Sequence, residues 1–243
     1  MAEMVGQKPK NVQKINSAYA IGANKTAKKS VSKLLNVPID YTVTINIKAL
    51  EQTVDFVGGI DVDSNLKVSY NGITIPKGHH HLNGKQALTY ARMRYQDPRG
   101  DYGRQLRQQQ VLEQVVHKLK KPKYIVQLPK LIKKTGGNVI TDLTDSQINA
   151  LPVKYYSIDN KFASKQLKEQ TAWINGSSYQ VASTKELQKV SDTLNKSMDR
   201  KTSKVDNTET ELNKQNKKFF SDPDNTDYDT KDLDTTYYTD NTH

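Results

Sequence analysis

Five arginines lie within sixteen residues of one stretch of the sequence, residues 90–110 (YARMRYQDPRGDYGRQLRQQQ). The first two, Arg92 and Arg94, are two positions apart, and in an extended segment residues two apart point to the same face. A guanidinium group is planar and can bind two phosphate oxygens at once. This spacing therefore predicts two guanidinium groups that face the same way and can bind a phosphate.

The other end of the stretch has the spacing of a helix. Arg104, Arg107 and Gln108 are three and four positions apart, so a helix would carry them on one face. Between the two groups, residues 97–101 (DPRGD) have the composition of a turn. A turn that leads into a helix start, with arginines on both sides, suits a diphosphate, because the N–H groups of the first helical turn add a favourable dipole.

Asp101 is the residue of this stretch that a plain run of positive charge would not need. A carboxylate among five arginines can orient them as an ion-pair partner, or help to remove the proton from a hydroxyl nucleophile. We take Asp101, with Arg99 in the same turn, as the candidate catalytic residues. The alternative is a solvated basic loop beside a basic helix, which is what most charge runs are.

The composition limits the classes of protein that the chain can belong to. It has 243 residues, 35% of them hydrophobic, no cysteine and a formal charge of +11. The absence of cysteine excludes disulfides, thiolate zinc sites and cysteine nucleophiles. No stretch approaches the roughly 18 to 20 apolar residues of a membrane-spanning helix, and we expect no signal peptide. An integral membrane bundle is therefore excluded, and the excess of positive charge predicts an anionic partner.

Charge and apolar residues separate the chain into two parts. Residues 1–200 carry a net charge of +15, whereas residues 201–243 hold six lysines against ten acidic residues. The final part has few large aliphatic residues, too few to offset the entropy lost on ordering, roughly 1–2 kcal/mol per residue. We predict one folded domain over residues 1–200 and a disordered acidic tail over residues 201–243.

Helical and alternating patterns follow one another along residues 1–200. Apolar residues at helical spacing predict helices, and strict alternation predicts strands. The predicted helices are 25–36, 49–56, 84–90, 105–120, 144–150 and 183–198, and the predicted strands are 41–47, 153–158 and 178–182. The expected fold class is α/β, a layered sheet with flanking helices.

Three adjacent histidines, residues 79–81, are a further candidate for chemistry as metal ligands. From a strand they cannot all face one ion, and no carboxylate stands at a helpful spacing in the sequence. We therefore predict no metal ligands among the residues of this chain.

Several runs of this sequence resemble the LytR-CpsA-Psr domain. The runs that resemble its second half are 58–63 (GGIDVD), 77–94 (KGHHHLNGKQALTYARMR) and 97–112 (DPRGDYGRQLRQQQVL). Residues 14–19 (KINSAY) and 36–46 (NVPIDYTVTIN) are similar to earlier segments of that domain. The resemblance is strongest over residues 12–121, and it implies the family's fold, in which a central sheet lies between helices.

The resemblance implies an extracytoplasmic transferase of Gram-positive bacteria. Such enzymes transfer an anionic glycopolymer, such as wall teichoic acid or capsule, from a polyprenyl diphosphate carrier onto peptidoglycan at the outer face of the cell membrane, with Mg²⁺ as the expected ion. Asp101 would orient the arginines or assist in removing a proton. Carried over by position, the diphosphate ligands would be Arg92, Arg94, Arg104, Arg107, Gln108 and Lys14.

The resemblance also sets an expectation about what this sequence lacks. Family members have a membrane-spanning helix and a first half-domain that binds Mg²⁺ and the diphosphate, so residues 1–200 are expected to be a partial domain and the Mg²⁺ ligands to lie in the missing half. Two other interpretations stay open: a non-catalytic remnant that binds polyprenyl phosphate or anionic wall polymer, and a transcriptional attenuator. No aromatic stacking platform accompanies the arginines, so we expect no nucleic-acid partner.

Overall fold

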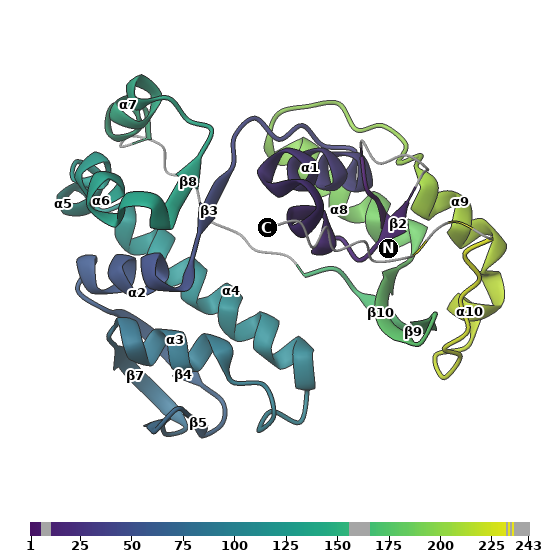
Figure 1. Cartoon of the computed structure of the whole chain (residues 1–243), viewed down its shortest axis with the longest axis horizontal. Helices are drawn as coiled ribbons and strands as arrows, with labels where there is room; N and C mark the ends of the chain where they lie inside the picture. The colour runs from purple at the N-terminus through teal and green to yellow at the C-terminus, as the bar shows by residue number, and fades with distance from the viewer. Residues whose placement is uncertain (6–10, 156–165, 232, 234, 236–243) are drawn as a thin grey trace. The chain divides into compact units, whose positions relative to one another are not determined.

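The structure is a computed structural model that describes residues 1–5, 11–155, 166–231, 233 and 235. The chain divides into two compact units, one formed by Met1–Thr42 with Lys165–His243 and the other by Val43–Ser164. We call the first the terminal unit and the second the central unit, after their places in the sequence, and describe each by itself (Figure 1). The arginine motif belongs to the central unit.

The central unit combines short strands with helices. Its strands are β3 (Val43–Ile45), β4 (Ile60–Ser64), β5 (Val68–Tyr70), β6 (Ile73–Ile75), β7 (Gly78–Leu82) and β8 (Val139–Thr141). Its helices are α2 (Ile47–Phe56), α3 (Gly84–Arg92), α4 (Gly100–Leu119), α5 (Pro122–Ile125), α6 (Leu128–Thr135) and α7 (Asp145–Tyr155), with a 3-10 turn at Gly136–Asn138. The strands pair antiparallel, β3 with β8, β4 with β7, and β5 with β6.

The core of the central unit is built by α2, α3, α4 and the paired strands β4 and β7 (Figure 1). One large residue from each element is at most 1% exposed: Val54, Ile60, Leu82, Tyr90 and Val111. All five belong to one continuous hydrophobic cluster. Because burial of a large apolar side chain contributes about 1.5–3 kcal/mol, this cluster fixes how α3 and α4, the two helices of the arginine motif, pack together.

The helix that leads into the arginine motif starts at a capping box. The side chain of Asn83 accepts a hydrogen bond from the backbone N–H of Gln86, and the side chain of Gln86 accepts one from the backbone N–H of Asn83. The Asp55 carboxylate, on α2, accepts the N–H of Gly84 at 2.7 Å. These bonds satisfy N–H groups that the first turn of a helix leaves without partners, so they define where α3 begins.

The terminal unit is made from both ends of the chain. Its elements are β1 (Ala2–Glu3), β2 (Val12–Gln13), α1 (Ser17–Leu35), β9 (Glu169–Ile174), β10 (Ser177–Ala182), α8 (Thr184–Ser197), α9 (Thr208–Gln215) and α10 (Lys217–Ser221). The strands β1 and β2 pair antiparallel, as do β9 and β10. The backbone of α1 is not helical at Gly22 and Ala23, so two helical pieces meet there.

The prediction of a disordered tail is wrong for residues 201–231. This part of the chain forms α9 and α10 and buries Val205, Leu212, Phe219 and Tyr228 in the terminal unit. The rings of Phe219 and Tyr228 meet edge to face with centroids 5.2 Å apart. Apolar residues are few here but they are buried together, which an average over composition does not detect. Residues 236–243 lie outside the described residues.

The mixed α/β class is confirmed, although the strands of the described residues form five antiparallel pairs and not one layered sheet. The helices predicted at 84–90, 105–120 and 183–198 correspond to α3, α4 and α8. The strand predicted at 153–158 is wrong for residues 153–155, which end α7, and its other residues are not among those described. None of the described helices combines the length and hydropathy that a membrane span requires.

Candidate functional site

The arginine motif spans the end of α3, a turn and the start of α4. Arg92 is the last residue of α3, and Met93, which follows in extended conformation, is only 1% exposed. Arg94 has 52% of its side chain exposed. The prediction that Arg92 and Arg94 share an extended segment is wrong, because α3 continues through Arg92. Both arginines are nevertheless exposed, one on each side of the buried Met93.

Asp101, in the first turn of α4, lies between two arginines. Its Oδ1 is 2.5 Å from a terminal nitrogen of Arg104 and 3.8 Å from Nε of Arg94. Its Oδ2 accepts a hydrogen bond from Gln105 at 3.2 Å. The carboxylate is 39% exposed, and the dipole of α4 favours negative charge at this end of the helix. We call Arg92, Arg94, Asp101 and Arg104 the exposed group.

Two contacts orient the side chains at the edge of the exposed group. The guanidinium of Arg92 lies over the ring of Tyr70, 5.6 Å from its centroid, which is a cation–π distance. Gln108 donates a hydrogen bond to the carbonyl of Ala91 at 3.3 Å and so ties α4 to the last turn of α3. The structure therefore places Gln108, a predicted diphosphate ligand, beside the residue that precedes Arg92.

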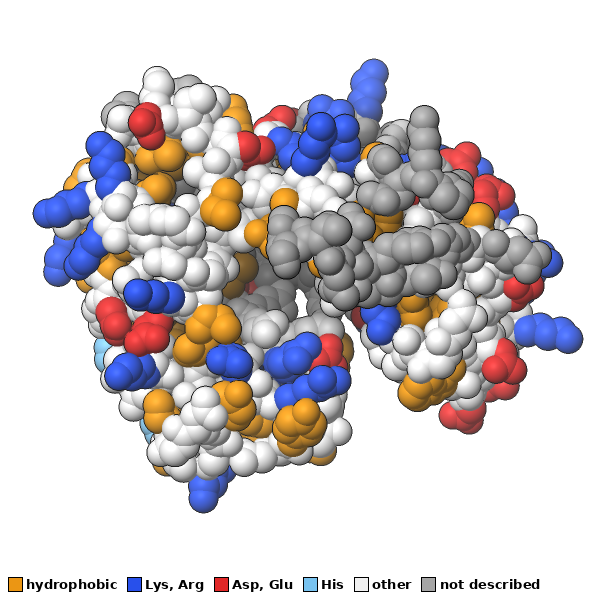
Figure 2. Space-filling view, viewed as in Figure 1, with side chains coloured by type: hydrophobic (Ala, Val, Ile, Leu, Met, Phe, Trp, Pro, Cys, Tyr) orange, Lys and Arg blue, Asp and Glu red, His pale blue; other side chains and the backbone are white. Residues whose placement is uncertain are grey.

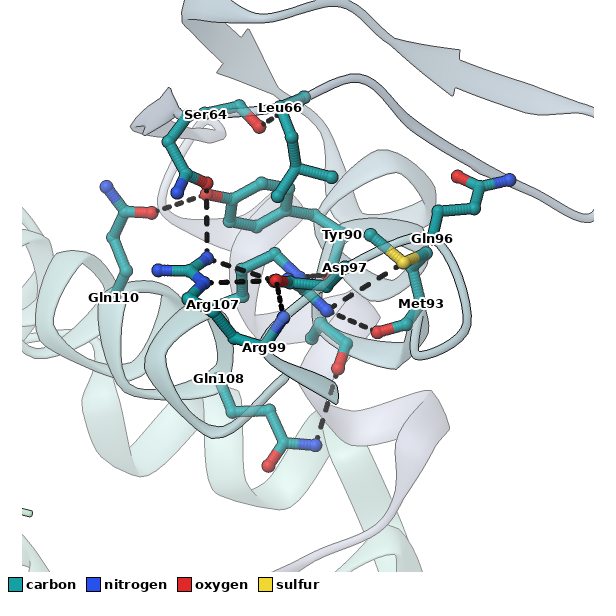
Figure 3. A network of polar contacts seen from close by, with 12 residues as sticks. Ser64, Leu66, Tyr90, Met93, Gln96, Asp97, Arg99, Arg107, Gln108 and Gln110 are labelled. Carbon is teal, nitrogen blue, oxygen red and sulfur yellow. Dashed lines mark hydrogen bonds and ion pairs between the residues drawn. The ribbon is translucent and has the colours of Figure 1, made fainter. Parts of the chain in front are cut away.

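Two charges are buried inside the motif and are bound by a third that is partly exposed (Figure 3). The side chain of Asp97 is 0% exposed and that of Arg107 is 2% exposed. Arg107 donates from Nη1 to Asp97 Oδ2, from Nε to the carbonyl of Tyr90 at 3.0 Å, and from Nη2 to the carbonyl of Met93. Arg99 binds both oxygens of Asp97, with Nε 3.0 Å from Oδ1 and Nη2 2.9 Å from Oδ2. We call Asp97, Arg99 and Arg107 the Asp97 network.

The members of the Asp97 network favour one another's charged forms. Hydrogen bonds from Arg99 hold the pKa of the Asp97 carboxyl well below its usual range, although burial acts in the opposite direction. The same bonds raise the pKa of the Arg99 guanidinium. Burial raises the pKa of the neighbouring Tyr90 phenol, whose hydroxyl donates to Gln110 at 2.7 Å. Asp97 and Arg99 are therefore both ionised around neutral pH.

The Asp97 network changes the roles of two predicted site residues. Arg107 was predicted to bind the diphosphate. Its guanidinium instead donates hydrogen bonds to one carboxylate and two backbone carbonyls, so its role is structural. Arg99, a predicted catalytic residue, is bound to Asp97 and, at 3.3 Å, to Asn65. Arg99 thus holds the turn that carries Arg94, and its head group is directed to protein partners.

Asp97 was not among the site residues predicted from the sequence, where it was assigned only to a turn. The signal that points to it is glycine at position 103, since a Cβ there would lie 2.0 Å from Asp97 Oδ2. Only glycine lets the carboxylate approach the backbone of α4 so closely. Gly100 has a different reason: its φ of +58° lies in the left-handed region, and this allows the sharp turn between Arg99 and Asp101.

Lys14, the remaining predicted ligand, belongs to the terminal unit and not to the unit of the arginines. Its Nζ lies over the ring of Tyr179, 4.8 Å from the centroid. Together with Ser17 and Asn175 the two residues line a cavity of about 800 Å³. Lys14 and the exposed group thus belong to different units, and the role of Lys14 stays a prediction.

Two of the three histidines lie opposite carboxylates, which differs from the prediction that none is suitably placed. The register of β4 and β7 pairs Asp61 with His81 and Asp63 with His79, and Nδ1 of each histidine is 2.6 Å and 2.9 Å, respectively, from its aspartate. Side-chain bonding to His81 lowers the pKa of Asp61. Among the described residues, no three side chains of His, Cys, Asp or Glu converge as metal ligands would.

The fold and the exposed group define a mixed α/β protein with an arginine-rich surface site. Residues 1–196 match the LytR_cpsA_psr family, and the chain belongs to this family. A curated relative from Enterococcus faecalis, named polyisoprenyl-teichoic acid–peptidoglycan teichoic acid transferase TagU, is 37% identical over 188 residues. The match covers 77% of this chain and 62% of the relative, so the chain spans about three fifths of that relative's length.

Solved structures have the same fold. One is described as a transcriptional regulator from Enterococcus faecalis, with a TM-score of 0.75 and 35% identity, and the match covers 90% of this chain and 79% of that one. Another is described as TagT bound to LIIa-WTA, with a TM-score of 0.62 and 26% identity, covering 75% of this chain and 70% of that one. The resemblance of the sequence to the LytR-CpsA-Psr family is thus confirmed.

Proposed function

We propose that the chain acts in the transfer of an anionic glycopolymer, of teichoic acid or capsule type, from a polyprenyl diphosphate to peptidoglycan at the extracytoplasmic face of the cell membrane. The observation that carries the proposal is the exposed group, in which the Asp101 carboxylate lies between Arg94 and Arg104. The name of the Enterococcus faecalis relative supports it, because that protein is named for transfer of polyisoprenyl-linked teichoic acid to peptidoglycan.

In this proposal the charges of the exposed group have separate tasks. The guanidinium groups of Arg92, Arg94 and Arg104 bind the diphosphate oxygens and stabilise the negative charge of the transition state. A sugar hydroxyl of the acceptor attacks the phosphorus that carries the polymer. The new P–O bond joins polymer and acceptor, the P–O bond to the polyprenyl phosphate breaks, and the hydroxyl proton passes to Asp101.

The Asp97 network has a positioning role in this mechanism. It joins the end of α3 to α4, since Arg107 binds the carbonyls of Tyr90 and Met93 as well as Asp97. The exposed arginines project from these two helices and the turn between them. A rigid base of this kind reduces the reorganisation needed to bind the diphosphate.

Mg²⁺ is the ion that the family resemblance leads us to expect, and no cluster of three ligand side chains occurs for it among the described residues. No three candidate side chains converge, and the carboxylate of Asp101 is already engaged by Arg94 and Arg104. The mechanism therefore has no step through a metal. Dependence of transfer on added Mg²⁺ remains a prediction for an activity assay.

A transfer assay tests the proposal. It uses this protein, a polyprenyl diphosphate-linked glycopolymer and peptidoglycan, and it measures labelled polymer that becomes insoluble. We expect Asp101→Asn to lower the rate by about 10²–10⁴-fold, the usual contribution of a general base. Asp145→Asn is the matched control, because Asp145 is also an exposed acid in the first turn of a central-unit helix and should leave the rate unchanged.

Binding measurements made beside this assay, with the diphosphate lipid and with DNA or RNA, separate the alternatives. If the protein binds the diphosphate lipid with no transfer at all, the transferase proposal is rejected in favour of a binding remnant. The attenuator interpretation predicts binding to DNA or RNA with a steep dependence on salt, and little response to substitution of Asp101.

A further inference from the structure

The end of α4 and the helices α5 and α6 form a lysine-rich part of the central unit. Residues 118–134 hold seven lysines in seventeen positions, and no Asp or Glu occurs between Glu113 and Asp142. Six of these lysines are exposed; one is Lys120 at the end of α4, and the five on and next to α5 and on α6 are Lys121, Lys123, Lys130, Lys133 and Lys134. We call these five residues the lysine surface.

The positive charge of the lysine surface is not neutralised by the fold. Within the part of the chain that the structure describes, none of the five forms an ion pair. Lys118, in the last turn of α4, behaves differently, because it lies 3.5 Å from the Asp61 carboxylate and is only 16% exposed. Like charges gathered without counter-charges repel one another, so this arrangement stabilises the fold little and favours an external anion.

Apolar residues divide between the inside and the outside of the same helices. Ile125 of α5 and Leu131 of α6 are 7% and 5% exposed, and they fix the two helices to the central unit. Val126, between the two helices, is 62% exposed. An aliphatic side chain thus projects into solvent with lysines on both sides of it along the chain.

The distribution of charge is visible on the molecular surface. Figure 2 shows basic side chains at the left edge of the view, where Figure 1 places α5 and α6. The three lysines of α6 are spaced three and four residues apart, so they lie on one face of that helix, at Lys130, Lys133 and Lys134. The basic residues therefore share a direction instead of surrounding the helix.

From these observations we infer that the lysine surface docks on an anionic lipid surface. Lysine ammonium groups bind lipid phosphates while their methylene stems lie along the apolar boundary, and Val126 enters that boundary between them. A soluble polyanion would also attract the lysines, but it offers no apolar phase for Val126. The combination of an exposed aliphatic residue with unpaired lysines is what favours lipid.

Vesicle binding tests this inference without any transfer reaction, and the lysine surface shares no residue with the exposed group. The protein is sedimented with vesicles of phosphatidylglycerol and phosphatidylcholine, or of phosphatidylcholine alone. We expect binding to the anionic vesicles only, weakened by salt. Lys130→Gln, Lys133→Gln and Lys134→Gln together should lower the partition coefficient about a hundredfold, given the usual contribution of three lysines near an anionic membrane.

The matched control removes three exposed lysines from α8 of the terminal unit: Lys185→Gln, Lys189→Gln and Lys196→Gln. It changes the net charge equally and should keep most of the binding. Equal losses for the two triple variants, or no preference for anionic vesicles, would overturn the inference.

A second variant distinguishes lipid from a soluble polyanion. Val126→Ser should lower vesicle binding about tenfold, because an apolar contact with the bilayer is lost, and it should leave binding of soluble polyphosphate unchanged. If Val126→Ser binds vesicles like the original protein, the lysine surface is a polyanion site and the lipid assignment is wrong. Because Val126 is largely exposed, this substitution does not disturb the core.

Discussion

The exposed group and the Asp97 network both consist of ion pairs between aspartate and arginine, but they differ in their surroundings and in the roles that follow. In each an aspartate pairs with two arginines; the exposed group comes from the end of α3, the segment that follows it and α4, whereas the Asp97 network comes from the turn and α4. Asp101 is 39% exposed, whereas Asp97 is completely buried. In water an ion pair contributes little to stability and its partners can exchange, but a buried pair is costly to break. Burial therefore separates the aspartate that can meet a ligand from the one that holds the site, whereas Arg99 and Arg104 are 35% and 32% exposed and differ in their partners.

The largest expected effect of this difference is on stability. Asp97→Asn removes the charge that compensates the buried Arg107 guanidinium, so we expect it to lower the free energy of unfolding by about 3–5 kcal/mol. Urea denaturation followed by circular dichroism measures this. The control Asp145→Asn, at an exposed position, should change the free energy of unfolding by no more than about 0.5 kcal/mol. A similar small value for Asp97→Asn would show that the network does not hold the turn.

Low pH should lower the free energy of unfolding by protonating the Asp97 carboxylate. The folded-state pKa of Asp97 is lowered from the unfolded value of about 3.9, so its contribution to stability is complete above about pH 4 and is lost as the pH falls towards the lower folded-state pKa. The measurement is the free energy of unfolding as a function of pH for the original protein and for Asp97→Asn. The variant should have the weaker pH dependence below pH 4, and identical slopes would contradict the assignment.

Glycine 103 provides a smaller and independent test of the network. In Gly103→Ala the new Cβ would lie 2.0 Å from an oxygen of Asp97, so the carboxylate must move. We expect a loss of about 1–3 kcal/mol in the free energy of unfolding, typical of overpacking. Because both changes act on one contact, the double variant with Asp97→Asn should lose less than the sum of the two. Strict additivity would mean that Gly103 and Asp97 are not coupled.

The exposed group should show the smallest effect on stability and a clear effect on binding. Arg94→Ala should change the free energy of unfolding by less than about 0.5 kcal/mol, since Arg94 is 52% exposed and 3.8 Å from its partner. Binding to a polyprenyl diphosphate should fall about tenfold or more, because a charge-assisted contact is lost. Arg200→Ala, an exposed arginine of the terminal unit, is the charge control. Equal binding by the two variants would remove Arg94 from the site.

The sequence predicted the helix of the motif better than the burial of its side chains. Helical spacing correctly placed Arg104, Arg107 and Gln108 on α4, but spacing cannot tell which side of a helix another element covers. The packing of α3 on α4 buries Arg107 and leaves Arg104 partly exposed. That packing depends on contacts distant in the sequence, such as those in the cluster of Ile60 and Tyr90.

The C-terminal part of the chain shows what composition alone fails to predict. Its composition indicated disorder, yet residues 201–231 are ordered because four apolar side chains are buried with residues far away in the sequence. Composition averages over a segment, whereas ordering depends on whether a few side chains meet a complementary surface. The mixed α/β class was predictable because it rests on local periodicity alone.

The most direct test of the central claim, that the exposed group performs the chemistry and the Asp97 network holds it in place, is to measure both stability and transfer for Asp101→Asn. We expect a free energy of unfolding within about 0.5 kcal/mol of the original protein together with a transfer rate lower by about 10²–10⁴-fold. Retained transfer, or a loss of stability as large as that of Asp97→Asn, would contradict it.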